Sequence, residues 1–109
     1  MISTALERMG VAFSTEFKIQ LYRYRYDLHL TDTNVLIEYH GIQHFKPIDK
    51  FGGVEEFEAT VKRDQLKVEI AKEYGYDLIV LNYRHLSKGK LINKLLRELK
   101  KRNIVGRST

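Results

Sequence analysis

Apolar and polar residues alternate in two runs that flank a short polar turn in the first half of the chain. The first run covers Tyr26–Leu30 and the second covers Val35–His40, with Asp32 and Thr33 at the centre of the turn. Alternation with a period of two is typical of strands that have one buried face. Two such runs joined by a short polar segment predict a β-hairpin within residues 26–44.

The turn also predicts how the two strands pair. If it is centred on Asp32 and Thr33, position i lies opposite position 65 − i, which places Asp27 opposite Glu38. Directly opposed residues have Cβ atoms about 5 Å apart. Two carboxylates that close repel each other unless one is protonated or a divalent cation lies between them. The alternative is that both are ordinary solvent-facing residues of a half-exposed hairpin.

More polar groups follow this pair along the chain. Alternation puts His40 on the same face as Glu38, and Gly41 is expected to end or bend the strand. Gln43 and His44 come directly after the bend. The hairpin therefore predicts a site for a hard cation with candidate proton carriers beside it.

The N-terminal part of the chain predicts a short helix and a strand. Ser3–Met9 forms the helix, which Gly10 ends, and alternation over Phe13–Tyr26 predicts a strand that leads into the hairpin. A tyrosine stripe on one face of this strand either stacks nucleic-acid bases or packs under a helix. On the other face, Arg23 and Arg25 would bring positive charge to a bound phosphate.

The second half predicts a helix, a strand and another helix. Val54–Tyr74 forms the main helix, ended by Gly75 in a left-handed cap. Asp77–Leu81 is a nearly continuous apolar run, typical of a central strand buried on both faces. Ser87–Arg102 forms a helix with a leucine-rich face and a basic face that either contacts DNA or is solvated. A strand–helix–strand succession predicts a parallel crossover, so we expect an α/β fold with a mixed sheet flanked by helices.

The face of the main helix that meets the sheet has two interpretations. One is an apolar stripe centred on Asp64 and made of Phe57, Val61, Val68 and Ala71. A carboxylate on a buried stripe needs a partner, because burying it alone is costly. The other is a stripe on the opposite side, made of Ala59, Leu66 and Ile70, which would leave Asp64 solvated.

Length and composition limit the number of domains, the kinds of site and the partners that we expect. A chain of 109 residues with 43% hydrophobic content fits one domain over 1–109, with a core at 13–102 and a frayed tail at 103–109. The chain has no cysteine, which excludes disulfides, thiolate metal sites and a cysteine nucleophile. Since no apolar run approaches about 20 residues and the start lacks a signal-peptide pattern, we expect a cytoplasmic protein without a membrane partner. The net charge of +5 suits a polyanion such as DNA.

Several of these segments resemble the PD-(D/E)XK nuclease superfamily. They are Arg25-Tyr26-Asp27, Glu38-Tyr39-His40-Gly41-Ile42-Gln43-His44, Arg63-Asp64 and Gly75-Tyr76-Asp77-Leu78-Ile79, within residues 13–84. Within the superfamily, the chain is similar to small phage and mobile-element nucleases related to very-short-patch repair endonucleases and EDxHD homing endonucleases. The resemblance implies a restriction-endonuclease-like fold and DNA cleavage that depends on Mg²⁺, with Mn²⁺ as a substitute.

The resemblance also implies roles for individual residues. The metal ligands would be Asp27, Glu38 and the carbonyl of Tyr39. The remaining catalytic groups would be His40 or His44 for proton transfer, Gln43 to position water or phosphate, and Asp64 to orient a histidine. The DNA backbone would be held by Arg23, Arg25, Arg63 and Lys67.

The chain departs from the superfamily pattern in three places. No proline precedes Asp27, the lysine expected two residues after Glu38 is His40, and the acidic residue of the first helix has no counterpart, because Glu7 has the wrong spacing. The missing lysine motivates an alternative, a non-catalytic DNA-binding module with the same fold. A further alternative is a Holliday-junction resolvase, which would act as a homodimer.

Overall fold

The computed structural model describes residues 2–19, 22–82 and 88–105. The predicted helix start at Ser87 and the end of the predicted tail, residues 106–109, lie outside these ranges. The described elements, in chain order, are α1 (Ile2–Arg8), β1 (Phe13–Lys18), β2 (Arg25–Leu30), β3 (Val35–His40), the 3-10 helices η1 (Ile42–His44) and η2 (Asp49–Phe51), α2 (Gly53–Glu73), β4 (Asp77–Asn82) and α3 (Lys88–Lys101).

The strands form one mixed sheet in the order β1-β2-β3-β4. β2 is antiparallel to both of its neighbours, β1 and β3. β4 is parallel to β3, and the crossover helix α2 connects the two. The predicted α/β architecture, an antiparallel hairpin plus a parallel crossover strand, is confirmed at this level. The predicted register is also confirmed, since Leu28 pairs with Ile37 and His29 with Leu36.

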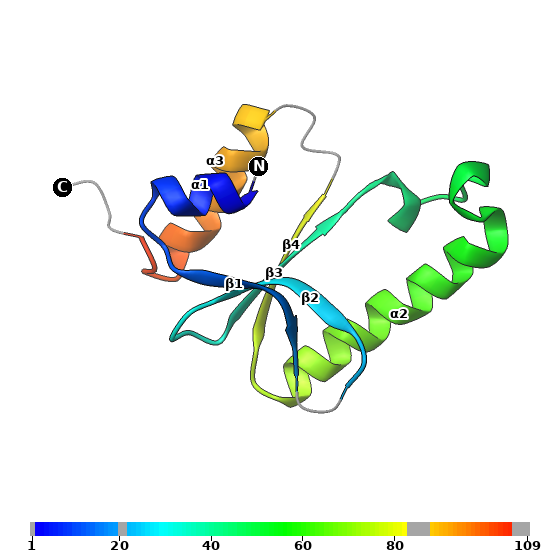
Figure 1. Cartoon of the computed structure of the whole chain (residues 1–109), viewed down its shortest axis with the longest axis horizontal. Helices are drawn as coiled ribbons and strands as arrows, with labels where there is room; N and C mark the ends of the chain where they lie inside the picture. The colour runs from blue at the N-terminus through cyan, green and yellow to red at the C-terminus, as the bar shows by residue number, and fades with distance from the viewer. Residues whose placement is uncertain (1, 20–21, 83–87, 106–109) are drawn as a thin grey trace.

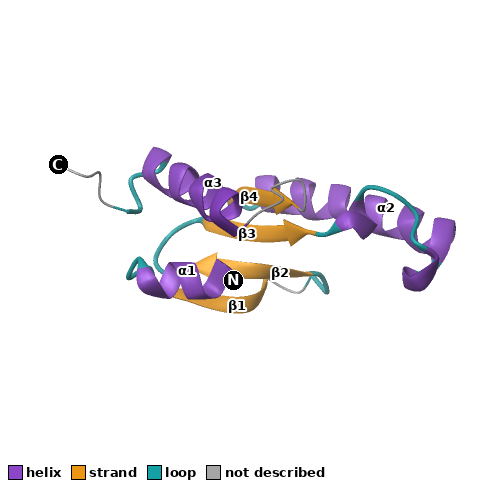
Figure 2. Ribbon diagram, turned by 90° about the horizontal axis from the view of Figure 1, so that it is seen from above, coloured by secondary structure: helices purple, strands orange, loops and turns teal. Residues whose placement is uncertain are grey.

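Helices cover both faces of the sheet. Figures 1 and 2 show α1 and α3 on one side and α2 on the other. The larger core lies under α1 and α3 and includes Leu6, Leu30, Ile37 and Leu95. The smaller core lies under α2 and includes Tyr26, Leu36 and Ile70. Among the helices that the structure describes, none has both the length and the apolarity needed to cross a bilayer.

The predicted long strand over Phe13–Tyr26 is wrong. β1 ends at Lys18 and β2 begins at Arg25, and the two pair with each other as a second hairpin. The chain turns after Ile19, whose carbonyl accepts a hydrogen bond from the amide of Tyr22. Both strands of this hairpin alternate, so periodicity alone could not separate one long strand from two paired ones.

The tyrosine stripe packs under a helix, one of the two uses that the sequence allowed. Tyr26 is only 1% exposed, and its hydroxyl donates a hydrogen bond of 2.5 Å to the carbonyl of Lys67 in α2. Tyr22 and Tyr24 are partly buried and pack against the same core. These rings therefore anchor α2 to the sheet.

The interpretation of Asp77–Leu81 as a central strand is wrong. Within the described residues β4 forms an edge of the sheet, and Val80 is 36% exposed. Ile79 and Leu81 are buried under α1 and α3, whereas α2 covers the other face of β4 incompletely. An apolar run therefore indicated a strand correctly but not its place in the sheet.

A cluster of ion pairs ties the end of α3 to the start of β4. The guanidinium of Arg102 donates to both carboxylate oxygens of Asp77, at 2.5 and 3.1 Å, and to Oε1 of Glu98 at 2.9 Å. The bond from Arg102, reinforced by Lys94 and Lys101, lowers the pKa of Glu98 to about 2. This clamp holds α3 against the sheet.

We expect Arg102→Ala to lower the free energy of unfolding by about 1–2 kcal/mol at neutral pH, because hydrogen bonds to charged groups stabilise and partial exposure weakens them. The pKa of Glu98 is lowered, so its contribution is present above its ordinary value of 4.5 and is lost as the pH falls towards 2. Urea denaturation at several pH values should therefore show the difference from wild type shrinking in acid. Arg97→Ala, on the exposed side of the same helix, is the control and should change little.

Candidate functional site

Strands β2 and β3 stop pairing through their backbones at Asp27 and Glu38. Instead, the amide of Asp27 donates to Oε1 of Glu38 at 3.1 Å, and the amide of Tyr39 donates to Oδ2 of Asp27 at 2.8 Å. Each carboxylate thus accepts a hydrogen bond from the backbone of the opposite strand. The structure brings the two predicted acidic residues together in the gap between the strands.

An irregularity in β1 and β2 lets Asp27 reach this gap. Its neighbours Tyr26 and Leu28 are both buried, but Tyr26 packs under α2 and Leu28 under α1 and α3. Regular alternation would put them on one face. Glu16, which the register of β1 places opposite Asp27, has a φ of 50°, a conformation that is costly for a residue with a side chain. The break in alternation between Tyr26 and Leu28 therefore coincides with the position at which Asp27 meets β3.

Glu38 is a buried carboxylate with two side-chain partners. It is 4% exposed, and its Oε1 accepts a bond of 2.6 Å from Nζ of Lys67, while its Oε2 lies 3.3 Å from Nε2 of His40. Burial alone would raise the pKa of Glu38, but the bonds from His40 and Lys67 outweigh it and keep the pKa below its ordinary value. Glu38 is therefore charged, and an ammonium compensates it.

The negative charge of Asp27 is less well compensated than that of Glu38. Asp27 is exposed as a residue. Desolvation of its carboxyl group, and then the charge of Glu38, raise the pKa of this group, although the bond from the amide of Tyr39 works against both. Within the described residues no ion pair links Asp27 to a cationic side chain. The repulsion between the two acids therefore raises the pKa of Asp27 and not that of Glu38, because Lys67 and His40 form hydrogen bonds with Glu38.

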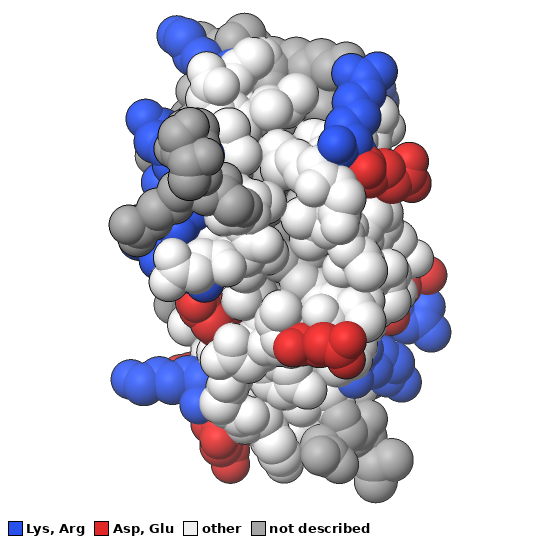
Figure 3. All heavy atoms as spheres, turned by 90° about the vertical axis from the view of Figure 1, so that its left-hand side faces the viewer, with Lys and Arg blue, Asp and Glu red and all other residues white. Residues whose placement is uncertain are grey.

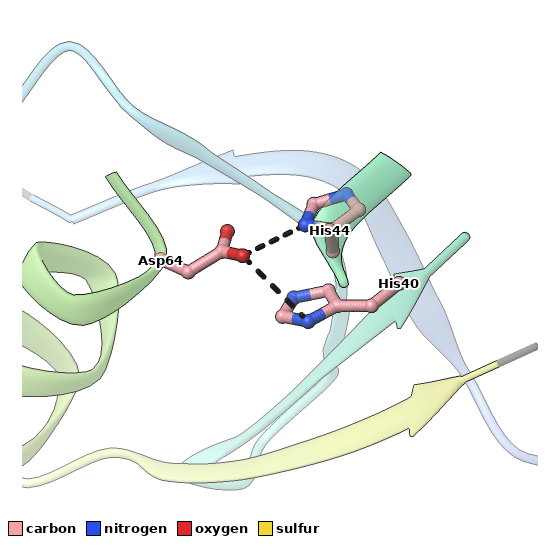
Figure 4. Close-up of side chains that lie close together, drawn as sticks. All are labelled: His40, His44 and Asp64. Carbon is pink, nitrogen blue, oxygen red and sulfur yellow. Dashed lines mark hydrogen bonds and ion pairs between the residues drawn. The ribbon is translucent and has the colours of Figure 1, made fainter. Parts of the chain in front are cut away.

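The next group of side chains joins β3, η1 and α2. Asp64, in the middle of α2, has its Oδ2 2.8 Å from Nδ1 of His44 and 3.9 Å from Nδ1 of His40 (Figure 4). The two imidazole rings are stacked with centroids 4.2 Å apart and planes 5° from parallel. Ion pairs and hydrogen bonds therefore connect Lys67, Glu38, His40, Asp64 and His44 in one chain of contacts.

Gln43 lies in η1 against the backbone of Gly41. A Cβ at position 41 would be 2.6 Å from Oε1 of Gln43, so glycine leaves room for this amide. Gln43 and His44 also line a cavity of about 340 Å³ together with Lys46, Phe51, Phe57 and Arg63. The segment between η1 and α2 thus forms a wall beside the site.

The four residues predicted to hold DNA have different surroundings. Arg23 and Arg25 are exposed near the start of β2, where Arg25 lies 3.9 Å from Glu16. Arg63 is partly buried and donates to Thr60 at 3.0 Å. Lys67 is only 9% exposed, because its ammonium is bonded to Glu38 and lies 5.0 Å from the ring centroid of Tyr26.

Neither predicted apolar stripe matches the buried face of α2. Leu66 and Val68 are both exposed, and the buried residues of the helix are Thr60, Lys67, Ile70 and Ala71. Asp64 is partly buried and faces the site, so the expectation that it needs a partner is confirmed. The stripes failed because the part of α2 near the site packs on polar groups rather than on an apolar surface.

The contact between Lys67 and Glu38 was not predicted from the sequence. The spacing carried a signal, since Lys67 lies three residues after Asp64, and residues three apart share one face of a helix. A helix that turns Asp64 towards the hairpin also turns Lys67 towards it. Comparisons with protein-family models, with curated proteins and with solved structures found no match to this chain.

Proposed function

We propose that this chain is a divalent-metal-dependent DNA endonuclease with a restriction-endonuclease-like fold, related to the PD-(D/E)XK superfamily. One observation carries the proposal: Asp27 and Glu38 enter the gap between β2 and β3, and the ammonium of Lys67 is bonded to Glu38. Two acids and a lysine at one point suit the hydrolysis of a phosphodiester, because the site must hold a cation and face a developing negative charge.

The donor atoms at this point fit Mg²⁺, with Mn²⁺ as a substitute. Asp27, Glu38 and the carbonyl of Tyr39 offer only oxygen, which hard cations prefer. The raised pKa of Asp27 supports the fit, since its carboxylate has a cost that a cation would relieve. When bound, the ion would lower the pKa of a coordinated water and offset charge on the scissile phosphate.

Lys67 supplies the positive charge that the linear motif lacks. The sequence has His40 where the superfamily pattern has a lysine, but Nζ of Lys67 lies 2.6 Å from Oε1 of Glu38. In the proposed reaction this ammonium keeps Glu38 ionised and faces the attacked phosphate. The lysine therefore comes from α2 rather than from β3.

The histidines are the proposed proton carriers. Asp64 accepts from His44 at 2.8 Å and orients its ring, as a carboxylate does for a catalytic imidazole. His40 lies between Glu38 and Asp64, at 3.3 and 3.9 Å. His44, with Gln43 beside it, borders the open cavity and is the better placed of the two to receive a proton from water or give one to the leaving oxygen.

The DNA is proposed to lie across the end of the hairpin rather than over α1 and α3. Figure 3 views the molecule from the side of α1 and α3, where Lys and Arg are interspersed with Asp and Glu. The exposed Arg23 and Arg25, near Asp27, and Arg63, on the wall of the cavity, would then contact phosphates. Cleavage of both strands would need a second copy, so a homodimer is part of the proposal.

The test is cleavage of supercoiled plasmid by the full chain. We expect nicking or linearisation with Mg²⁺ or Mn²⁺ and none in EDTA, whereas Asp27→Ala should leave the plasmid intact in every metal. A gel shift in EDTA should show that both proteins still bind DNA, because the arginines are unchanged. Cleavage by Asp27→Ala at the wild-type rate would overturn the proposed site.

A non-catalytic DNA-binding module remains the second candidate. It is favoured by the saturation of Oε1 of Glu38, which already accepts bonds from Lys67 and from the amide of Asp27. In such a module Lys67 would replace a cation permanently. Metal-independent DNA binding without cleavage in any metal would select this alternative.

A further inference from the structure

His40, His44 and Asp64 bring three metal-binding side chains to one point. One donor atom from each side chain lies within 4.8 Å of the other two. In Figure 4 the Asp64 carboxylate faces both imidazole rings across the space between α2 and the end of β3. All three residues are partly buried, so the rings and the carboxylate are held by their elements.

The donor set differs in kind from the Asp27 and Glu38 pair. Two imidazole nitrogens and one carboxylate oxygen suit zinc and similar transition ions, whereas Mg²⁺ prefers oxygen alone. Donor atoms about 2.0–2.1 Å from a tetrahedral zinc ion lie about 3.3 Å from one another. The distance from Oδ2 of Asp64 to Nδ1 of His44 is 2.8 Å and that to Nδ1 of His40 is 3.9 Å. Because the two imidazole rings are stacked, they would have to rotate for both nitrogens to point at one ion.

Among the residues that the structure describes, Nδ1 of His40 makes no hydrogen bond. Nδ1 of His40 faces Asp64 at 3.9 Å, which is too long for a hydrogen bond. The other nitrogen of the same ring, Nε2, is 3.3 Å from Oε2 of Glu38. A histidine that binds a metal through one nitrogen and a carboxylate through the other is the usual arrangement in metal sites.

Space for a further ligand adjoins the cluster. His44 forms part of the wall of the 340 Å³ cavity, whose other lining residues include Gln43 and Thr60. Three protein ligands with an open position for water are the pattern of accessible zinc sites, whereas purely structural sites are closed by four protein ligands.

We infer that His40, His44 and Asp64 form a binding site for a transition-metal ion of the zinc type, separate from the oxygen site of Asp27 and Glu38. The inference does not depend on cleavage, because it rests on the donor atoms alone. If the proposed nuclease activity holds, an ion here would withdraw both imidazoles from proton transfer, and Zn²⁺ would antagonise the Mg²⁺-dependent reaction.

The test is calorimetric titration of the full, tag-free chain with Zn²⁺ in a large excess of Mg²⁺. We expect one ion per chain, and Asp64→Asn and His44→Ala should each weaken binding by at least about tenfold, since each removes a ligand. The controls are His29→Gln, whose ring lies elsewhere on the hairpin and bonds to the carbonyl of Thr33, and Asp32→Asn in the exposed turn. Both should bind as wild type does.

A second measurement keeps the inference testable if a variant fails to fold. Zinc X-ray absorption of the loaded wild type should show nitrogen and oxygen neighbours with the outer-shell scattering of two imidazoles. Absence of Zn²⁺ binding, displacement of Zn²⁺ by Mg²⁺, or equal affinity in folded cluster variants and in the controls would overturn the inference. The remaining use of the cluster would then be the hydrogen-bonded orientation of His44.

Discussion

Lys67→Met is expected to abolish DNA cleavage and to lower the free energy of unfolding by about 3–5 kcal/mol, because it leaves the charge of Glu38 buried without a partner. The two side chains are 11% and 5% exposed, and the bond between them is 2.6 Å. A loss of this size is a large part of the roughly 5–15 kcal/mol that stabilises a typical domain. Urea denaturation and the plasmid assay measure the two effects separately.

A double variant separates stability from chemistry. Glu38→Gln combined with Lys67→Met removes both charges of the pair, so most of the lost stability should return, since replacing a whole buried ion pair by neutral groups costs little. Cleavage should stay absent, because neither the acid nor the ammonium remains. If Lys67→Met unfolds like wild type, the ion pair does not stabilise the fold, and if it still cuts DNA, Lys67 has no part in cleavage.

Asp27→Asn is expected to raise the melting temperature while abolishing cleavage. The pKa of Asp27 is raised by burial and by Glu38, so the folded state binds a proton more tightly than the unfolded chain does. Stability therefore falls as the pH rises from the ordinary value of 3.8 through the folded pKa. Asparagine removes this charge but keeps an oxygen for the amide of Tyr39.

Calorimetry at neutral pH, with and without Mg²⁺, checks this prediction. Mg²⁺ should raise the melting temperature of wild type but not that of Asp27→Asn, because a ligand stabilises only the protein that binds it. Asp32→Asn, a change of the same chemistry in the exposed turn, should alter neither melting nor cleavage. A lower melting temperature for Asp27→Asn would mean that its charge stabilises the fold.

The hairpin register was predictable because its determinants are local. The turn at Asp32 and Thr33 and the two alternating runs specify which positions face each other, and a slip of one residue would expose the buried set. Leu28 opposite Ile37 therefore followed from the sequence. The same local signals failed between Lys18 and Arg25, where the alternation of one strand continued into that of the next.

The position of Asp64 was predictable only in part. Helical periodicity put it in the same arc as Ala71, which is buried, but also as Val68, which is exposed. The middle of the helix contacts Glu38 and His44 through Lys67 and Asp64. Its C-terminal part packs on Tyr26 and Leu36 through Ile70 and Ala71, so the inner face is polar where the site lies. An apolar stripe cannot reveal a face whose partners are ionised.

The sequence by itself determined the three α-helices, the register of the hairpin formed by β2 and β3 and the opposition of Asp27 to Glu38, because turns and periodicity act over a few neighbouring residues. Only the tertiary structure decided that Lys67 neutralises Glu38 and that Asp64 meets His44. Those contacts depend on how α2 crosses the sheet, which is set by the packing of whole surfaces. Residues 29 or 20 positions apart in the chain meet through that packing, and no local pattern specifies it.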